Sequence, residues 1–174
     1  MKIVLIGYMG SGKSAVGKQL SNKLNHSFKD LDTEIERAEG LSVPQIFSEK
    51  GEIYFRKLEN KTLKSLLALN EDFVLATGGG TPCYADSLTA MLQNENTVTI
   101  YLKTPLIVLG DRLFLEMGKR PLLTHLETKE QLMEYIGIHV FERSHFYNRA
   151  QITIEVGTDS VEGVAKRIAE TIPK

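Results

Sequence analysis

One glycine-rich segment, residues 7–14, constrains this chain more than any other part of its sequence. It reads Gly-Tyr-Met-Gly-Ser-Gly-Lys-Ser and fits the pattern G-x-x-x-x-G-K-[S/T]. In that pattern the glycines let successive backbone N–H groups converge on phosphate oxygens, the lysine brings a positive charge, and the last hydroxyl can bind Mg²⁺. The apolar run at residues 3–6 predicts a buried strand before the segment, and Val16, Leu20 and Leu24 predict a helix after it. This context favours a loop that binds a nucleoside triphosphate over a chance glycine-rich turn.

Composition narrows the class of protein around that loop. The 174 residues suit one domain, residues 1–174, with a full hydrophobic core. A formal net charge of -1 gives no electrostatic signature of nucleic-acid binding. Cys83 is the only cysteine, which excludes an intrachain disulfide and a cysteine zinc cluster. No apolar run approaches the roughly 20 residues that span a bilayer. We therefore expect a cytoplasmic protein with small-molecule partners and no membrane association.

Apolar runs alternate with helical patterns along the chain, which predicts a parallel sheet inside a doubly wound, three-layer α/β domain. Ligands of such domains bind at the carboxyl ends of the strands. Two segments interrupt the alternation. Residues 32–70 read as helices without a strand, broken at Gly40 and Gly51. Residues 117–128 are polar with little periodicity, which is typical of a substrate cap or a mobile lid. The expected strands lie near Phe28 and at residues 3–6, 73–76, 98–102 and 152–156.

Two carboxylates follow the second apolar segment. Asp30 and Asp32 are two residues apart, so on an extended chain both would point to the side of the phosphate loop. Asp30 would then orient metal-bound water while Asp32 reaches an acceptor hydroxyl. The alternative is that the two acidic residues only cap a helix that starts at Thr33.

Three arginines are candidates for binding a carboxylate or phosphate. Arg56 and Glu59 share one helical face, either as a simple surface ion pair or beside a small carbocyclic acid. Arg143 and Tyr147 are four residues apart near the end of a long helix, where arginine suits bidentate carboxylate binding. Arg120 lies in the expected lid, where it either closes over the γ-phosphate or remains solvated. Two aromatic residues near Arg56, core side chains by default, would suit the wall of an acid site: Phe47 and Phe55.

Two further features point to the same edge of the sheet. The triplet at residues 78–80 follows an expected strand, and its bare amides either meet a ligand or form a flexible turn. Arg112, on the helix before the lid, either stacks on an adenine ring or faces solvent. The four histidines show no ligand spacing.

Taken together, an ordered set of motifs along nearly the whole chain resembles shikimate kinase. The set is more specific than the phosphate loop, which many nucleotide hydrolases and kinases share. The motifs are GYMGSGKS at 7–14, DLD at 30–32, FRKLE at 55–59, TGGG at 77–80, KRPLL at 119–123 and ERSHFY at 142–147.

The resemblance implies transfer of the ATP γ-phosphoryl group to the 3-hydroxyl of shikimate, in chorismate biosynthesis. It implies a P-loop kinase with a five-stranded sheet of order 2-3-1-4-5, a shikimate-binding region at about 32–70 and a mobile lid at about 117–128. Lys13 and Arg120 would stabilise the transferring group, Ser14 and Asp30 would hold Mg²⁺, and Asp32 would be the base. Residues implied for ATP are Gly10, Ser11, Gly12, Lys13, Ser14, Ala15, Arg112 and Arg120.

Residues implied for shikimate are Asp32, Phe47, Phe55, Arg56, Gly79, Gly80 and Arg143. Two positions depart from the family pattern. Ser144-His145-Phe146 lack a proline that is usual in the family, so the helix there could start or bend differently. Pro82 comes shortly after the glycine triplet, and the geometry of the triplet's amides is therefore not fixed by the family pattern. We expect a monomer. Two rival functions remain, another small-metabolite kinase such as a gluconate kinase, and a nucleotide-binding module without catalysis.

Overall fold

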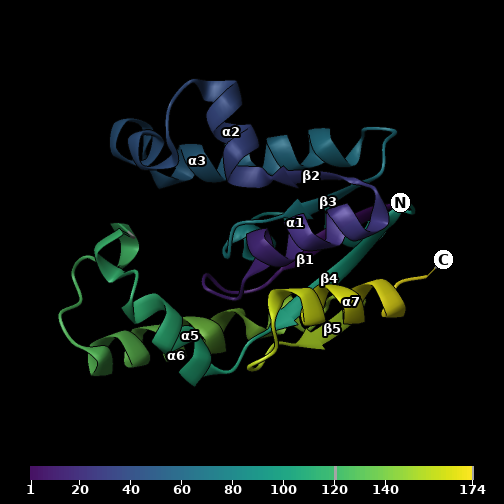
Figure 1. Cartoon of the computed structure of the whole chain (residues 1–174). Coiled ribbons are helices and arrows are strands. Elements are labelled where there is room, and N and C mark those ends of the chain that lie inside the picture. The colour runs from purple at the N-terminus through teal and green to yellow at the C-terminus, as the bar shows by residue number, and fades with distance from the viewer. Residues whose placement is uncertain (120, 174) are drawn as a thin grey trace.

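The protein, studied as a computed structural model, is described over residues 1–119 and 121–173. A parallel five-stranded sheet runs through its middle with helices on both sides (Figure 1). The strand order is β2-β3-β1-β4-β5, which confirms the expected order. Strands are β1 Lys2–Ile6, β2 Ser27–Asp30, β3 Phe73–Ala76, β4 Thr97–Lys103 and β5 Ile152–Glu155. Helices are α1 Lys13–Leu24, α2 Leu31–Glu39, α3 Val43–Leu67, α4 Ser87–Gln93, α5 Leu106–Phe114, α6 Lys129–Tyr147 and α7 Val161–Thr171. Short 3₁₀ turns are η1 Thr81–Cys83, η2 Met117–Lys119 and η3 Pro121–Leu123.

Alternate side chains of the central strand enter two separate cores, because successive side chains of a strand point to opposite faces. Ile3 and Leu5 pack with residues of α1 and α7. Val4 and Ile6 pack with residues of α2 to α6 on the other face. Burial on both faces explains why the strand is an unbroken apolar run rather than an alternating one. The result is the three-layer arrangement expected from the sequence.

The segment at residues 32–70 is helical, as expected, and both expected breakpoints are present. Gly40 ends α2 with φ 69°, and Gly51 interrupts α3 with φ 81°. Ser42 caps α3 by accepting a hydrogen bond from the Gln45 N–H. The α2–α3 hairpin therefore lies beyond the carboxyl end of β2 as two helices joined by a short turn (Figure 1).

The expected lid segment, residues 117–128, lies between α5 and α6 and contains the turns η2 and η3. Leu123 is fully buried in the core, whereas Leu122 is exposed. Arg120 lies outside the described residues. In the described ranges, no helix has both the length and the apolar character needed to cross a membrane.

A glycine brings α1 close to the sheet. A Cβ atom on Gly17 would lie 2.6 Å from a ring carbon of Phe28 and 3.3 Å from Leu5. We expect Gly17→Ala to lower the free energy of unfolding by about 1–2 kcal/mol, because an overpacked contact outweighs the gain in helix propensity. Chemical denaturation measures the change.

The matched control is Gly137→Ala on α6, where a Cβ atom would meet only Leu106 at an ordinary 3.6 Å. This variant should be more stable than wild type by about 0.5–1 kcal/mol, since alanine loses less backbone entropy in a helix. Equal effects of the two substitutions would contradict the close approach of α1 to β2.

Candidate active site

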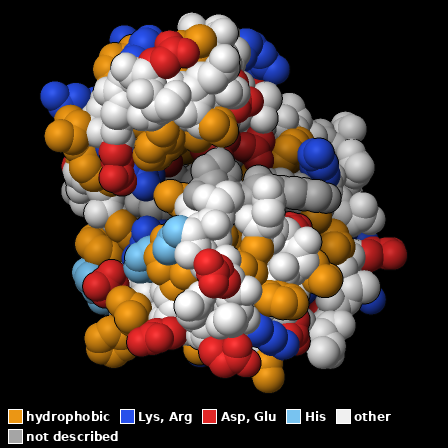
Figure 2. All heavy atoms as spheres, turned by 90° about the vertical axis from the view of Figure 1, so that its left-hand side faces the viewer, with side chains coloured by type: hydrophobic (Ala, Val, Ile, Leu, Met, Phe, Trp, Pro, Cys, Tyr) orange, Lys and Arg blue, Asp and Glu red, His pale blue; other side chains and the backbone are white. Residues whose placement is uncertain are grey.

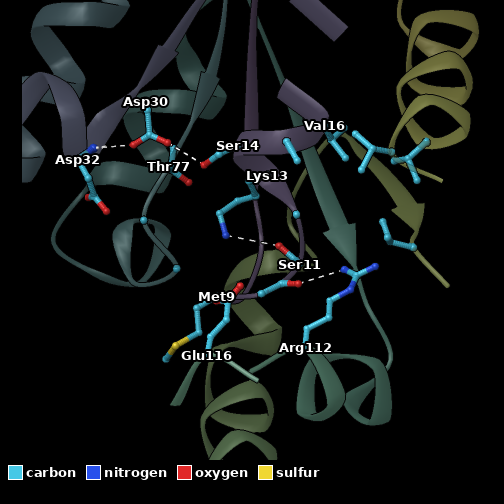
Figure 3. A pocket seen from close by; sticks show the side chains of 18 of the residues that line it. Met9, Ser11, Lys13, Ser14, Val16, Asp30, Asp32, Thr77, Arg112 and Glu116 are labelled. Carbon is cyan, nitrogen blue, oxygen red and sulfur yellow. Dashed lines mark hydrogen bonds between the residues drawn. The ribbon is translucent and has the colours of Figure 1, made fainter. Parts of the chain in front are cut away.

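The phosphate loop, residues 7–12, joins β1 to α1 as the sequence predicts. Lys13 is buried, and its ammonium group donates hydrogen bonds to the backbone oxygens of Gly7 at 2.8 Å and Tyr8 at 2.9 Å. The ammonium group is thus held by the loop, and Figure 3 shows it directed at the Ser11 side chain, whose hydroxyl oxygen lies 3.4 Å away.

That cavity has a volume of about 560 Å³ and opens along the carboxyl ends of the strands. The volume falls within the range of small-molecule sites, so it suits a nucleotide. All of the residues predicted to bind ATP that the structure describes contribute to its lining: Gly10, Ser11, Gly12, Lys13, Ser14, Ala15 and Arg112. The guanidinium of Arg112 donates to the Gly10 backbone oxygen at 3.1 Å.

Ser14 and Asp30 meet across the loop. The Ser14 hydroxyl donates to one Asp30 carboxylate oxygen at 2.8 Å, and the other oxygen accepts the Asp32 N–H at 3.2 Å (Figure 3). In the part of the chain that the structure describes, no group of three or more His, Cys, Asp or Glu side chains is suitable for a metal. Two oxygens beside a phosphate site nevertheless fit Mg²⁺, which takes most of its ligands from phosphates and water in such sites.

The structure corrects the geometry behind the Asp30 and Asp32 prediction. The chain is not extended through this pair, because α2 begins at Leu31 rather than at Thr33. Asp30 caps that helix and also bonds Ser14, so capping and site formation are not alternatives here. Asp32 lies in the first helical turn, and it still lines the cavity.

Asp32 is a partly buried carboxylate with an altered affinity for protons. Burial, followed by the nearby carboxylates of Asp30 and Glu59, raises the pKa of Asp32 to about 6, and Lys13 opposes the rise. The group is therefore ionised at neutral pH yet close to its titration range, as suits a general base.

A second cavity of about 310 Å³ adjoins the first and shares Asp32, Met9, Gly78 and Gly79 with it. The ring centroids of Phe47 and Phe55 lie 4.6 Å apart in this region. Figure 2 shows the corresponding face hollowed across its middle, between the α2–α3 hairpin above and the α5–α6 side below. Every residue predicted to bind shikimate lines this second cavity: Asp32, Phe47, Phe55, Arg56, Gly79, Gly80 and Arg143.

Arg56 and Glu59 form an ion pair in which the carboxylate is buried and the guanidinium is partly buried, so it is not the simple surface ion pair considered from sequence. The Arg56 guanidinium lies 2.9 Å from Glu59, which is only 1% exposed. The other Glu59 oxygen accepts a hydrogen bond from the Thr81 hydroxyl at 2.6 Å. A Cβ atom on Gly80 would lie 2.7 Å from the guanidinium, so this glycine is what allows Arg56 to pack against the loop. The glycine triplet is thus held in place rather than a flexible turn.

Arg143 and Tyr147 share one face of α6, as predicted. The Tyr147 hydroxyl donates to the Gly79 backbone oxygen at 2.6 Å, which ties this helix to the glycine loop. The helix continues through Ser144-His145-Phe146 without a break, so the missing proline does not bend it. Thr81 and Pro82 form the turn η1 directly after the triplet.

Four residues that line the second cavity were not singled out as ligand contacts from the sequence: Met9, Val43, Glu59 and Leu122. Met9 occupies a position where the loop pattern accepts any residue. Val43 follows the predicted break at Gly40 and Leu122 lies in the expected lid segment, and neither apolar residue carries a recognisable signal. Glu59 was considered only as a partner of Arg56, because the spacing of the two residues carries no information about burial.

Comparison with known proteins gives one consistent result. A family model described as "Shikimate kinase" matches residues 9–173. A shikimate kinase of Flavobacterium psychrophilum is 41% identical over 167 residues, which cover 96% of each chain. The crystal structure of shikimate kinase from Bacteroides thetaiotaomicron superposes with a TM-score of 0.89 at 33% identity, over 98% of this chain and 97% of the other. A shikimate kinase from Acinetobacter baumannii in complex with shikimate gives a TM-score of 0.85 at 34% identity, over 97% and 90%.

The pKa of Asp32 makes a prediction about stability. The folded protein holds the Asp32 proton up to a pKa of about 6, whereas the ordinary pKa of an aspartate is 3.8. Ionisation therefore lowers stability as the pH rises from about 4 to 6, and the loss is complete above pH 6. We expect Asp32→Asn to raise the free energy of unfolding at pH 8 by about 2–3 kcal/mol. Urea denaturation at several pH values measures this gain, which should shrink as the pH is lowered towards 4.

Glu95→Gln is the control, because Glu95 is exposed and distant from both cavities. Its stability should follow wild type at each pH within about 0.5 kcal/mol. If Asp32→Asn were no more stable than wild type at pH 8, the carboxylate would not be under the electrostatic strain described above.

Proposed function

The chain belongs to the shikimate kinase family, and we propose that it transfers the γ-phosphoryl group of ATP to the 3-hydroxyl of shikimate, giving shikimate 3-phosphate and ADP. The observation that carries the assignment of roles is the position of Asp32, which lines both the nucleotide-sized cavity and the smaller cavity with two arginines. A donor in one cavity and an acceptor in the other would meet beside this carboxylate.

On the nucleotide side, the phosphate loop and Lys13 bind the triphosphate. Lys13 reaches the β- and γ-phosphates by giving up its hydrogen bonds to loop carbonyls, which lie beside the expected phosphate path. Ser14 and Asp30 would hold Mg²⁺. When bound, Mg²⁺ neutralises charge on the phosphate oxygens. Arg112 lies against the adenine, and Arg120 of the lid reaches the γ-phosphate.

On the acceptor side, Arg56 and Arg143 bind the shikimate carboxylate, since guanidinium groups match carboxylate geometry. The amides of Gly79 and Gly80 receive ring hydroxyls. Phe47 and Phe55 cover the apolar part of the ring. This combination of two cations, bare amides and an aromatic wall fits a small carbocyclic hydroxy acid.

The chemical step needs alignment and charge neutralisation more than covalent catalysis. The 3-hydroxyl oxygen forms a bond to the γ-phosphorus as the bond from phosphorus to the bridging oxygen of ADP breaks. Asp32 accepts the hydroxyl proton, for which its pKa of about 6 is suited at neutral pH. Lys13 and Arg120 offset the negative charge on the transferring group.

The two rival functions have less support. A gluconate kinase would also use cationic residues, but the Arg56 and Glu59 pair against the glycine loop builds a cavity with an aromatic wall. A module that only binds nucleotide would need no carboxylate between two cavities. The proposal further includes one kinase domain over residues 1–174, a monomer, and action in the cytoplasm, where ATP and Mg²⁺ are available.

A coupled assay of ADP release tests the proposed function. Wild-type protein should turn over with shikimate, and gluconate or nucleoside monophosphates should support little turnover. Asp32→Asn should lower kcat by about 10²–10⁴-fold, because it removes the base while leaving the nucleotide cavity intact. Glu95→Gln should behave as wild type. Absence of shikimate-dependent turnover, or full activity of Asp32→Asn, would refute the proposal.

The metal assignment has its own test. Chelation of Mg²⁺ should abolish turnover, and Ser14→Ala should raise the Mg²⁺ concentration for half-maximal rate by about tenfold, because one metal ligand is lost. Ser14→Thr is the matched control, since it keeps the hydroxyl and fits the loop pattern. If Ser14→Ala and Ser14→Thr had the same Mg²⁺ requirement, the hydroxyl would not be a metal ligand.

A further inference from the structure

The two arginines of the acceptor cavity are held in different ways. Arg56 is paired with Glu59 at 2.9 Å and with Glu52 at 3.5 Å. In contrast, no carboxylate in the described ranges lies within ion-pair distance of Arg143. Neutral side chains therefore surround the Arg143 guanidinium, and one of them is Tyr147, a turn further along α6, whose hydroxyl interacts with it.

The aromatic ring of Tyr8 lies against that guanidinium. The central carbon of the Arg143 guanidinium is 5.6 Å from the centroid of the Tyr8 ring, within the range of a cation–π interaction. Tyr8 is only 2% exposed, so water weakens this attraction little. The ring face offers negative potential without a full negative charge, and it therefore leaves the arginine available for an anionic ligand.

The ring of Tyr8 is itself fixed at its far end. Its hydroxyl lies 3.3 Å from the Nδ1 atom of His139, one turn before Arg143 on α6. Tyr135, one turn earlier still, packs its ring edge-on against His139 with centroids 4.2 Å apart. Burial and the nearby Arg143 lower the pKa of His139, which favours a neutral imidazole next to the guanidinium. The Tyr8 side chain thus contacts α6, with its hydroxyl beside His139 and its backbone held in the phosphate loop.

Nothing in phosphate binding requires a tyrosine at this position. The loop pattern specifies glycines, a lysine and a hydroxyl, and it accepts any side chain at residue 8. The backbone of Tyr8 belongs to the phosphate site, because its carbonyl accepts a hydrogen bond from Lys13. Its side chain, however, points away from that site to the helix that carries Arg143.

We propose that Tyr8 is a positioning residue for Arg143, which holds the guanidinium ready for the carboxylate of the acceptor through the face of its ring. This inference rests on the proposed function, since it names the residue that orients one of the two acceptor-binding cations. It predicts that the side chain of Tyr8, although part of the phosphate loop, affects the acid substrate rather than ATP.

Steady-state kinetics of two variants test the proposal. Tyr8→Met fills similar space without an aromatic face and should raise the KM for shikimate about tenfold, with the KM for ATP and kcat within about twofold to threefold of wild type. Tyr8→Phe keeps the ring and should restore the shikimate KM to within about threefold of wild type. An unchanged shikimate KM in Tyr8→Met, or an equal rise in the ATP KM, would overturn the proposal.

Two further measurements separate positioning from a general loss of structure. The methyl ester of shikimate lacks the anionic group, so wild type should prefer shikimate to the ester, and Tyr8→Met should lose about tenfold of that preference. In an Arg143→Lys background, Tyr8→Met should change the shikimate KM by less than about twofold, because the two residues act as a pair. Additive effects would contradict the proposal. If Tyr8→Met does not unfold cooperatively, Tyr8→Leu takes its place with the same expectations.

The activity of the wild-type protein with shikimate separates a failure of the proposed function from a failure of the role of Tyr8. If wild type does not phosphorylate shikimate, the proposed function fails. If it does, and the Tyr8 variants show no selective effect on shikimate, only the role of Tyr8 is wrong.

Discussion

The parallel pairing of β2, β3 and β1 is the constraint on which the site depends. Asp30 is in register with Ala76, and Ala76 is in register with Leu5, so the three strands end at one edge of the sheet. The phosphate loop, the start of α2 and the glycine triplet all leave from that edge, although they are far apart in the sequence. A shift in the pairing of β2 would separate Asp30 from Ser14 and move Asp32 away from both cavities.

Charges at this edge are held by different kinds of partner, and the differences fit distinct roles. The Lys13 ammonium group donates hydrogen bonds to backbone oxygens, and bound phosphate would replace those oxygens as its partner. Each oxygen of Glu59 has a partner, one in Arg56 and the other in Thr81, so this group forms a well-anchored wall of the smaller cavity. Asp32 has neighbouring carboxylates that raise its pKa. A carboxylate with a raised pKa in a cavity suits the general base that we propose Asp32 to be.

The sequence was sufficient to predict the layers, the position of the phosphate loop and the two helical breaks at Gly40 and Gly51, because these follow from periodicity and glycine chemistry. The described residues that the order of the motifs singled out as binding residues line the two cavities, and their roles remain predictions. The start of α2 at Leu31 was missed because Asp30 caps the helix and bonds Ser14 at once, which spacing alone does not reveal. The partial burial of Arg56 and the placement of Tyr8 against Arg143 depend on tertiary packing, which the spacing of residues does not reveal. The phosphate-loop pattern also accepts any residue at position 8.

We propose that Asp32 lies between the site of the phosphoryl donor and the site of its acceptor. A crystal structure with shikimate, Mg²⁺ and a non-hydrolysable ATP analogue is the most direct test. We expect a shikimate hydroxyl within hydrogen-bond distance of the Asp32 carboxylate and facing the terminal phosphate, with the shikimate carboxylate on Arg56 and Arg143. A shikimate molecule bound with its carboxylate away from both arginines, or with no hydroxyl near Asp32, would contradict it.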